Sequence, residues 1–296
     1  MSDLLPASFA QHTVDADGVR IHTRVAGEGP PLLLLHGYPQ THLIWHHVAP
    51  ALTAFHTVVL TDLRGYGDSG KPPSDGDHAP YAKRAMARDQ LLVMRSLGFD
   101  RFAVAGHDRG ARVAHRLTLD HPGAVSALAV LDVVPTRHVY EHADAEFSRA
   151  YYHWGFLTAG NGIPEHLIGQ DPGFWVRARM DARHQGGTPF DEAAQAEYVR
   201  CFSDPAAIHA SCEDYRAAAT IDLAHDAEDA AAGRTVTAPL LALWGELGFV
   251  GRHYDVLGAW REYAADVRGT ALPCDHYVPE EAPGETVAHL REFFRE

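Results

Sequence analysis

Asp108 is a carboxylate in a setting where it can act as a nucleophile. It stands at the centre of the segment Gly106-His107-Asp108-Arg109-Gly110, which follows an apolar run at 102–105 and precedes a helix-like stretch at 111–117. A strand, a sharp turn and a helix in this order expose the side chain at the turn. An aspartate is ionised at neutral pH, so it can displace a halide or open an epoxide at a saturated carbon and form an ester with the enzyme. The segment therefore predicts covalent catalysis by Asp108.

A second loop fits the same chemistry. His36-Gly37-Tyr38-Pro39 follows the apolar run at 31–35, the position at which this arrangement places a loop that helps to form an oxyanion hole. We expect the N–H groups of Tyr38 and Arg109 to form that hole. The segment 62–70 follows another strand-like run, and we interpret its glycines as turn formers and its Arg64 and Asp68 as structural.

The order of catalytic groups along the chain identifies the partners of the nucleophile, because in this arrangement nucleophile, acid and histidine follow one another. His276 comes after the strand-like run 267–272 and before a final helix, so we predict that it activates water. Asp132 ends the strand-like run 127–131, and Glu246 ends the next one. We favour Asp132 as the acid because its short side chain follows directly from a buried strand.

Two arginines begin the predicted helix that follows the nucleophile. The first turn of a helix already carries partial positive charge, so Arg109 and Arg112 each cost about 0.3–1 kcal/mol there unless an anion is bound. Two guanidinium groups beside a nucleophile would hold a small carboxylate by paired hydrogen bonds. The alternative is that they pair with carboxylates of the protein. We interpret Arg116, one turn further on, as structural.

The chain alternates between strand-like and helix-like segments, which predicts an α/β fold with a mostly parallel central sheet and helices on both faces. Strands are expected at 20–25, 32–35, 57–60, 102–105, 127–131, 240–244 and 267–272, and helices at 82–97, 111–119 and 284–294. No strand pattern occurs between 131 and 240. We therefore predict a core domain of residues 1–135 and 225–296 and an inserted helical cap domain of residues 136–224, lying over the carboxyl ends of the strands.

Composition narrows the class of partner. The 296 residues carry 25 basic and 39 acidic side chains, a formal charge of −14, which argues against nucleic-acid or anionic-membrane partners. The first residues lack the pattern of a signal peptide, and no apolar run reaches membrane-spanning length, so we expect a cytoplasmic protein. The three cysteines, Cys201, Cys212 and Cys274, fit no zinc pattern and are interpreted as buried thiols.

Longer segments carry a family resemblance. The motifs are His36-Gly37-Tyr38-Pro39-Gln40, residues 62–67, residues 106–117, Tyr152-His153-Trp154 and residues 201–219. With them the chain resembles the fluoroacetate dehalogenases, haloacetate-hydrolysing members of the α/β-hydrolase superfamily. The resemblance implies a catalytic triad of Asp108, Asp132 and His276. It implies that Arg109 and Arg112 bind the substrate carboxylate. It also implies a halide pocket formed by His153, Trp154 and Tyr215. It also implies a homodimer and no metal or organic cofactor.

The chain departs from the family pattern at three places. Tyr38 replaces a phenylalanine, Ala111 stands where a second glycine is common, and Cys274-Asp275-His276-Tyr277 replaces a glycine-histidine-phenylalanine sequence. Tyr38 could add a hydroxyl near the substrate. Asp275 could raise the pKa of His276 or point into solvent. The three predicted halide ligands could also be packing residues, since aromatic side chains usually fill cores.

Together these features predict a haloacetate dehalogenase, a hydrolase acting on carbon–halide bonds. It would convert fluoroacetate or chloroacetate, small anionic haloacids, to glycolate and halide through an aspartyl ester. An epoxide hydrolase of the same fold is the first alternative, although Arg109 stands where those enzymes usually have an apolar aromatic residue. A receptor that binds a small carboxylate without catalysis is the second alternative.

Overall fold

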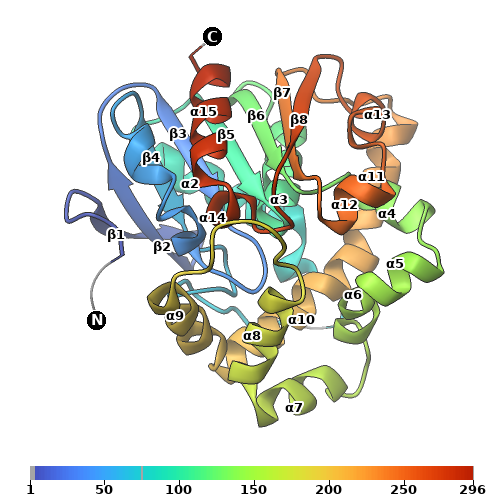
Figure 1. Ribbon diagram of the computed structural model, residues 1–296. Helices are drawn as coiled ribbons and strands as arrows, with labels where there is room; N and C mark the ends of the chain where they lie inside the picture. Colours follow the sequence, from blue (N-terminus) through green and yellow to red (C-terminus); the bar gives the residue numbers. More distant parts are fainter. Residues whose placement is uncertain (1–3, 75, 296) are drawn as a thin grey trace.

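The protein is built around one eight-stranded sheet (Figure 1). The structure, a computed structural model, describes residues 4–74 and 76–295. The strands lie in the order β1-β2-β4-β3-β5-β6-β7-β8. Their bounds are β1 Ala10–Ala16, β2 Val19–Ala26, β3 Pro31–Leu35, β4 Thr57–Thr61, β5 Phe102–His107, β6 Val125–Leu131, β7 Leu240–Gly245 and β8 Val267–Leu272. The pairs from β4 to β8 are parallel, and β1 and β2 are antiparallel additions at one edge. The α/β-hydrolase fold predicted from the sequence is confirmed.

All seven predicted strands are present, and β1 is an additional one. The prediction missed β1 because this edge strand is mostly exposed and has almost no apolar alternation. A local signal was nevertheless present in the turn that joins it to β2. Asp17 and Gly18 both have positive φ, 52° and 87°, and Asp-Gly between two strands is a typical two-residue hairpin turn.

The central strands are apolar along their whole length because both faces of the sheet are covered. All six residues of β5 are buried, and so are four of the five in β3. The longest core helices are α2 (Lys83–Ser96), α3 (Arg109–Asp120) and α15 (Pro283–Phe293), each close to its predicted range. Shorter core helices complete the layers: η1 His42–Trp45, α1 Ala49–Leu52, η2 Ala79–Tyr81, α12 Phe249–His253, α13 Val256–Arg261 and α14 Val278–Glu281.

Between β6 and β7 the chain forms helices only, and in Figure 1 the helices α6 to α10 lie below the sheet, at the ends of the parallel strands. They are α4 Thr136–Glu141, α5 Ala145–Ala150, α6 Tyr152–Leu157, α7 Ile163–Gln170, α8 Pro172–Asp181, α9 Glu192–Phe202, α10 Pro205–Ala219 and α11 Ile221–Ala231. The predicted domain boundary at residues 224 and 225 falls inside α11 and stays a prediction.

Two smaller expectations can be compared with the structure. Cys201, Cys212 and Cys274 are all buried and free, as interpreted from their spacing. Among residues 4–74 and 76–295, no helix combines the length and the apolar character that crossing a bilayer requires.

Candidate active site

Asp108 occupies a strained turn between β5 and α3. Its backbone adopts φ 47° and ψ −114°, a conformation that costs a non-glycine residue about 1–3 kcal/mol. Glycines on both sides make the turn possible. A Cβ on Gly106 would collide with the backbone of Gly110, and a Cβ on Gly110 would collide with the backbone of the loop after β3. The G-x-D-x-G spacing is therefore required by packing, and it presents Asp108 at the end of the central strand.

The loop after β3 approaches this carboxylate as expected. The N–H of Tyr38 donates to Asp108 Oδ2 at 3.2 Å. A Cβ on Gly37 would lie 2.6 Å from the Cβ of Asp108, so only glycine permits the approach. The Tyr38 hydroxyl accepts a hydrogen bond from the indole N–H of Trp175 on α8. The extra hydroxyl of this chain therefore links the core to the cap.

Asp132 and His276 form the predicted acid–base pair. His276 Nδ1 lies 2.6 Å from Asp132 Oδ2, and the N–H of Gly245 donates to Asp132 Oδ1 at 3.1 Å. His276 Nε2 is buried and makes no hydrogen bond among the described residues. The alternative acid, Glu246, is exposed. The structure therefore brings Asp132, rather than Glu246, to His276.

Burial determines the protonation of this pair. Desolvation, with a smaller effect of the Arg183 guanidinium, lowers the pKa of His276 well below its usual value. Its imidazole is therefore neutral at neutral pH and can accept a proton. Desolvation also raises the pKa of Asp132, while Arg183 and the Gly245 N–H act in the opposite direction. The neighbouring Asp275 is buried, so the expectation that it could point into solvent is wrong, and its carboxylate accepts a hydrogen bond from Gln185 at 3.0 Å.

Arg109 joins the core to the cap through Asp214 on α10. Its Nε donates to Asp214 Oδ2 at 3.0 Å, and its Nη2 contacts both the Asp214 carboxylate and the Asp214 carbonyl, the latter at 2.8 Å. Burial opposes the charge, but Asp214 outweighs burial and raises the pKa of Arg109 well above its usual value. Arg109 is thus paired within the protein, the alternative left open by the sequence. One donor, Nη1, still makes no hydrogen bond among the described residues.

Arg112 is held differently, by neutral oxygens. Its Nη1 donates to the Val134 carbonyl and to the Thr136 hydroxyl, each at 3.0 Å, and its Cζ lies 4.9 Å from the centre of the Trp154 ring. Desolvation and the nearby Arg109 charge lower the pKa of Arg112. Its Nε is buried without a partner in the described part of the chain. An anion at this point would relieve both the unpaired donor and the repulsion between the two arginines.

The predicted halide ligands lie together against these arginines. The ring centres of His153 and Tyr215 are 5.6 Å apart, those of Trp154 and Tyr215 are 6.0 Å apart, and Arg109 Cζ lies 4.3 Å from the Tyr215 ring. Burial, then Asp108, raises the pKa of Tyr215, so its phenol stays protonated. Burial and neighbouring arginines lower the pKa of His153, so its ring stays neutral. Both side chains can donate hydrogen bonds at neutral pH.

Unsatisfied polar atoms mark the centre of the site. Five buried atoms of the predicted residues make no hydrogen bond among the described residues, and each unmade bond costs free energy. They are Arg109 Nη1, Arg112 Nε, His153 Nδ1, Tyr215 Oη and His276 Nε2. A cavity of about 10 Å³, close to the space of one water molecule, is lined by Asp108, Arg112, Asp132, Tyr151 and Trp154 among others. The arrangement suits a small polar ligand.

Sequence reasoning missed two contributors from the cap. Asp214 was part of a recognised motif, but nothing local indicated that it would pair with Arg109. Arg183 contacts the Tyr151 hydroxyl, and its carbonyl accepts the N–H of His276 at 3.4 Å, yet its surrounding sequence carries no signal. The arginines interpreted as structural are fully engaged elsewhere: Arg64 pairs with Asp89, and Arg116 pairs with three aspartates.

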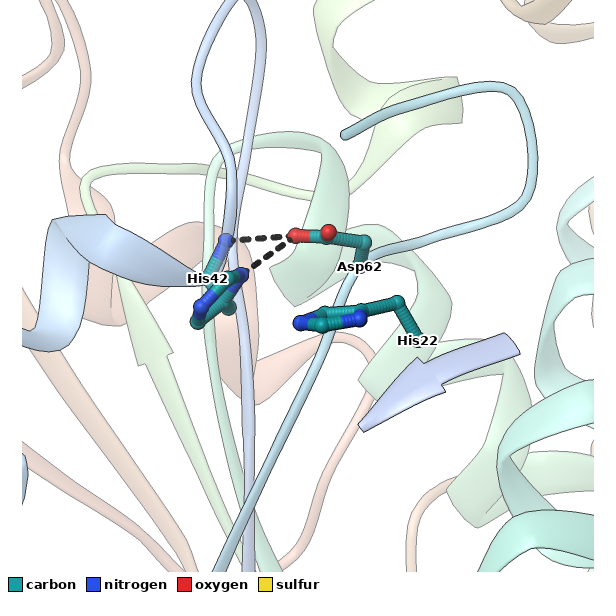
Figure 2. A group of neighbouring side chains, drawn as sticks. All are labelled: His22, His42 and Asp62. Carbon is teal, nitrogen blue, oxygen red and sulfur yellow. Dashed lines mark hydrogen bonds and ion pairs between the residues drawn. The ribbon is translucent and has the colours of Figure 1, made fainter. Parts of the chain in front are cut away.

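One group of side chains away from the triad has metal-ligand chemistry. Figure 2 shows His22 and His42 beside the Asp62 carboxylate, and one ligand atom from each residue lies within 4.8 Å of the others. Both oxygens of the Asp62 carboxylate already accept hydrogen bonds from the protein. Asp62 Oδ1 accepts the main-chain N–H of His42 at 2.9 Å and lies 2.8 Å from its Nδ1, and Asp62 Oδ2 accepts the N–H of Asp68 at 2.9 Å. We therefore interpret the group as a structural connection between β2, β4 and the loop after β3.

Comparison with known proteins agrees with the fold. A model of the alpha/beta hydrolase fold family matches residues 30–283. The chain belongs to this family and is a hydrolase of this fold.

Within the family, the chain is similar to a dehalogenase and to epoxide hydrolases. It is 45% identical over 286 residues to a fluoroacetate dehalogenase from Burkholderia sp., covering 96% of this chain and 93% of that protein. It is 34% identical over 304 residues to a soluble epoxide hydrolase from Corynebacterium sp. (strain C12), covering 98% and 99%. The chain is thus similar to haloacetate dehalogenases, as the motifs predicted.

Solved structures show the same similarity of fold. A protein from Nostoc sp. PCC 7120, assigned to the alpha/beta hydrolases, has a TM-score of 0.95 and 55% identity, over 97% of this chain and 98% of that chain. A Pseudomonas aeruginosa protein assigned to the epoxide hydrolases, solved as a mutant with bound MFA, has a TM-score of 0.93 and 45% identity, over 99% and 98%.

Proposed function

We propose that this hydrolase is a haloacetate dehalogenase that converts fluoroacetate or chloroacetate to glycolate and halide. The observation that carries the proposal is the set of unpartnered donors on Arg109, Arg112, His153 and Tyr215, all on residues around Asp108. A haloacetate offers a carboxylate to the two guanidinium groups and a departing halide to the two neutral donors. The 45% identity to a fluoroacetate dehalogenase supports the same activity.

The first half-reaction forms an ester. An oxygen of Asp108 attacks the carbon that bears the halogen, the carbon–halogen bond breaks, and the halide leaves with the bonding electron pair. Arg109 Nη1 and Arg112 Nε hold the carboxylate and so align the carbon with the nucleophile. His153, Trp154 and Tyr215 donate hydrogen bonds to the halide as its charge develops.

The second half-reaction hydrolyses the ester. Neutral His276, oriented by Asp132, takes a proton from water through Nε2, and the hydroxide formed attacks the carbonyl carbon of Asp108. The N–H groups of Tyr38 and Arg109 stabilise the tetrahedral oxyanion. Collapse of this intermediate releases glycolate and restores the Asp108 carboxylate, and His276 then passes its proton to solvent. The proposed steps use side chains and water alone.

An epoxide hydrolase is the second candidate, because the chain is 34% identical to one and the Tyr215 hydroxyl could protonate an epoxide oxygen. A neutral epoxide would leave the buried donors of Arg109 and Arg112 unpaired, which favours a carboxylate substrate. Parallel assays on fluoroacetate, chloroacetate, bromoacetate and styrene oxide separate the candidates. We expect halide release from haloacetates and no diol from styrene oxide, whereas a protein that binds haloacetate without turnover would be a receptor.

The covalent intermediate gives a direct test of the mechanism. His276→Ala should still displace halide but should not hydrolyse the ester. Intact-protein mass spectrometry after incubation with chloroacetate should therefore show a stable carboxymethyl adduct, which peptide mapping should locate on Asp108. Stoichiometric halide release from this variant without an adduct would contradict the assignment.

We also propose that the protein acts as a homodimer in the cytoplasm. Large exposed apolar side chains support an interface on the cap: Tyr152, Ile163, Leu167 and Phe174 lie on α6, α7 and α8 and are 47–64% exposed. Exposed apolar patches of this kind commonly mark protein interfaces. Light scattering coupled to size-exclusion chromatography measures the oligomeric state, and Leu167→Glu with Phe174→Glu should shift a dimer to monomer.

A further inference from the structure

The cap helix α8 brings two more guanidinium groups to the site. Arg179 lies on α8 and Arg183 just beyond its end, and their side chains are 4% and 9% exposed. Arg179 Cζ lies 5.3 Å from the centre of the Tyr152 ring. Arg183 Cζ lies 4.5 Å from the Tyr151 ring, and this guanidinium also donates to the Tyr151 hydroxyl. The rings of Tyr151 and Tyr152 lie 5.5 and 6.1 Å from the His153 ring, so both cations lie near the proposed halide pocket.

Neither cation has a carboxylate in direct contact among the described residues, although Asp108 and Asp132 favour the charge of Arg183 from a greater distance. Among residues 4–74 and 76–295, no carboxylate lies within 4.0 Å of Arg179 or Arg183, and Arg179 Nε makes no hydrogen bond. Other arginines of the fold show the usual arrangement: Arg64 pairs with Asp89, and Arg109 pairs with Asp214. A buried charge without a partner is costly. An anion that binds during the reaction would remove that cost.

The proposed reaction generates such an anion at the right place. Before displacement the negative charges lie on Asp108 and on the substrate carboxylate. After displacement Asp108 is a neutral ester, and its charge has moved to the halide. His153, Trp154 and Tyr215 donate hydrogen bonds but carry no positive charge. Arg179 and Arg183 also lower the pKa of His153, after burial, so their positive field reaches that ring.

We infer that Arg179 and Arg183 form an anion-binding pair of the cap that receives the halide as the carbon–halogen bond breaks. The halide keeps the bonding electron pair, and the new bond joins the substrate carbon to an Asp108 oxygen, so no further reactant is needed. The inference rests on the proposed dehalogenation for the identity of the anion. It adds a charged second position behind the neutral donors of the halide pocket.

Equilibrium halide binding tests the pair without turnover. Sodium bromide is titrated into the protein at constant ionic strength, with sodium gluconate as the balancing salt, and the fluorescence of the nearby Trp154 and Trp175 is followed. We expect saturable quenching, and in the double variant Arg179→Met, Arg183→Met a bromide Kd at least about tenfold weaker. Arg177→Met is the matched control, because Arg177 is on the same helix but exposed. No saturable bromide binding by the unmodified protein, or equal binding by the double variant, would overturn the inference.

Thermal stability separates an anion-binding role from a structural one. Because neither cation has a carboxylate within 4.0 Å in the described chain, replacing them by methionine should leave the Tm unchanged or raise it, and added bromide should stabilise the unmodified protein only. A lower Tm in both single variants would assign them a structural role instead. Arg183→Lys, which keeps the charge, should retain part of the bromide binding.

The bromide titration and the activity assay together distinguish a failure of the anion-binding pair from a failure of the proposed function. An active dehalogenase whose variants bind bromide normally would refute the anion-binding pair and leave the function standing. A protein that lacks dehalogenase activity but loses bromide binding in the variants would support the pair and refute the function.

Discussion

The arginines near the two ends of α3 differ in how completely the protein satisfies their hydrogen-bond donors. Near its C-terminal end, Arg116 donates to Asp120, Asp226 and Asp229 at 3.1, 2.7 and 2.5 Å. At its N-terminal end, Arg109 and Arg112 each keep one buried donor without a partner in the described chain. A buried arginine that only stabilises the fold is expected to have its charge matched within the protein. Unmatched donors therefore indicate where a ligand completes the structure.

The same difference separates two histidine–aspartate pairs. His42 and Asp62 are tied into a loop by three hydrogen bonds to the carboxylate. His276 is held by Asp132 on one nitrogen only, and its other nitrogen is buried and unpartnered. Both pairs stand near the carboxyl ends of the parallel strands. The burial of this unpartnered nitrogen, rather than the residue types, distinguishes the proposed catalytic pair from the structural one.

The largest expected effect is at the nucleophile. Asp108→Asn keeps the size of the side chain and the backbone conformation, since asparagine also tolerates positive φ, but it removes the charge that attacks carbon. We expect dehalogenation to fall by about 10⁴-fold or more with little change in Tm. Halide release is the measurement, and intact mass verifies the substitution. Residual activity within tenfold of that of the original protein would contradict the assignment of Asp108 as the nucleophile.

The next effect concerns the halide donors. Tyr215→Phe and Trp154→Phe keep an aromatic ring and remove a hydrogen-bond donor. Fluoride gains more from hydrogen bonds than bromide as it leaves, so each variant should slow defluorination about a hundredfold, equivalent to about 2.7 kcal/mol, and debromination far less. Rates on fluoroacetate and bromoacetate provide the comparison. Equal losses on both substrates at unchanged Tm would mean that these rings shape the pocket without binding the halide.

Arg112 and Arg116 give a matched pair on one helix. Arg112→Lys keeps the charge but loses the planar donor geometry, so kcat/KM on chloroacetate should fall by about tenfold or more while the Tm stays nearly constant. Arg116→Lys should do the reverse, lowering the Tm and leaving kcat/KM within about twofold. If Arg112→Lys and Arg116→Lys change the Tm and kcat/KM in the same way, then an unpartnered arginine donor does not indicate a role in substrate binding.

The smallest effect is a dependence of stability on pH. Burial raises the pKa of Glu280 to about 8, with hydrogen bonds from Tyr198 and Gln40 opposing it. The folded protein thus keeps a proton that the unfolded chain releases near pH 4.3. Stability should therefore fall as the pH rises from about 4 through about 8, the pKa of Glu280 in the folded protein, and level off above that pH. Glu280→Gln removes this dependence of stability on pH. The Tm of the variant relative to that of the original protein should therefore increase as the pH rises. A constant difference across that range would contradict the shift.

The local features of this protein follow from its amino-acid sequence alone. Apolar runs predicted seven strands, and the glycines around Asp108 and Tyr38 predicted the elbow and its facing loop, because these features depend on neighbours along the chain. The order of catalytic groups then indicated Asp132 and His276, which the structure brings within 2.6 Å of each other. β1 was missed because an exposed edge strand needs little apolar sequence.

Contacts between cap and core depend on how distant segments of the chain pack together. Arg109 pairs with Asp214, 105 residues away, and the Tyr38 hydroxyl bonds to Trp175, 137 residues away. Arg179 on α8 and Arg183 just after this helix lie near the site, although the sequence around them carries no catalytic motif. The packing of the inserted helices over the sheet determines which charged side chains have an ion-pair partner within the protein. The position of Asp108, the proposed nucleophile, is thus fixed by a local turn, whereas the side chains that surround it are brought together by long-range packing.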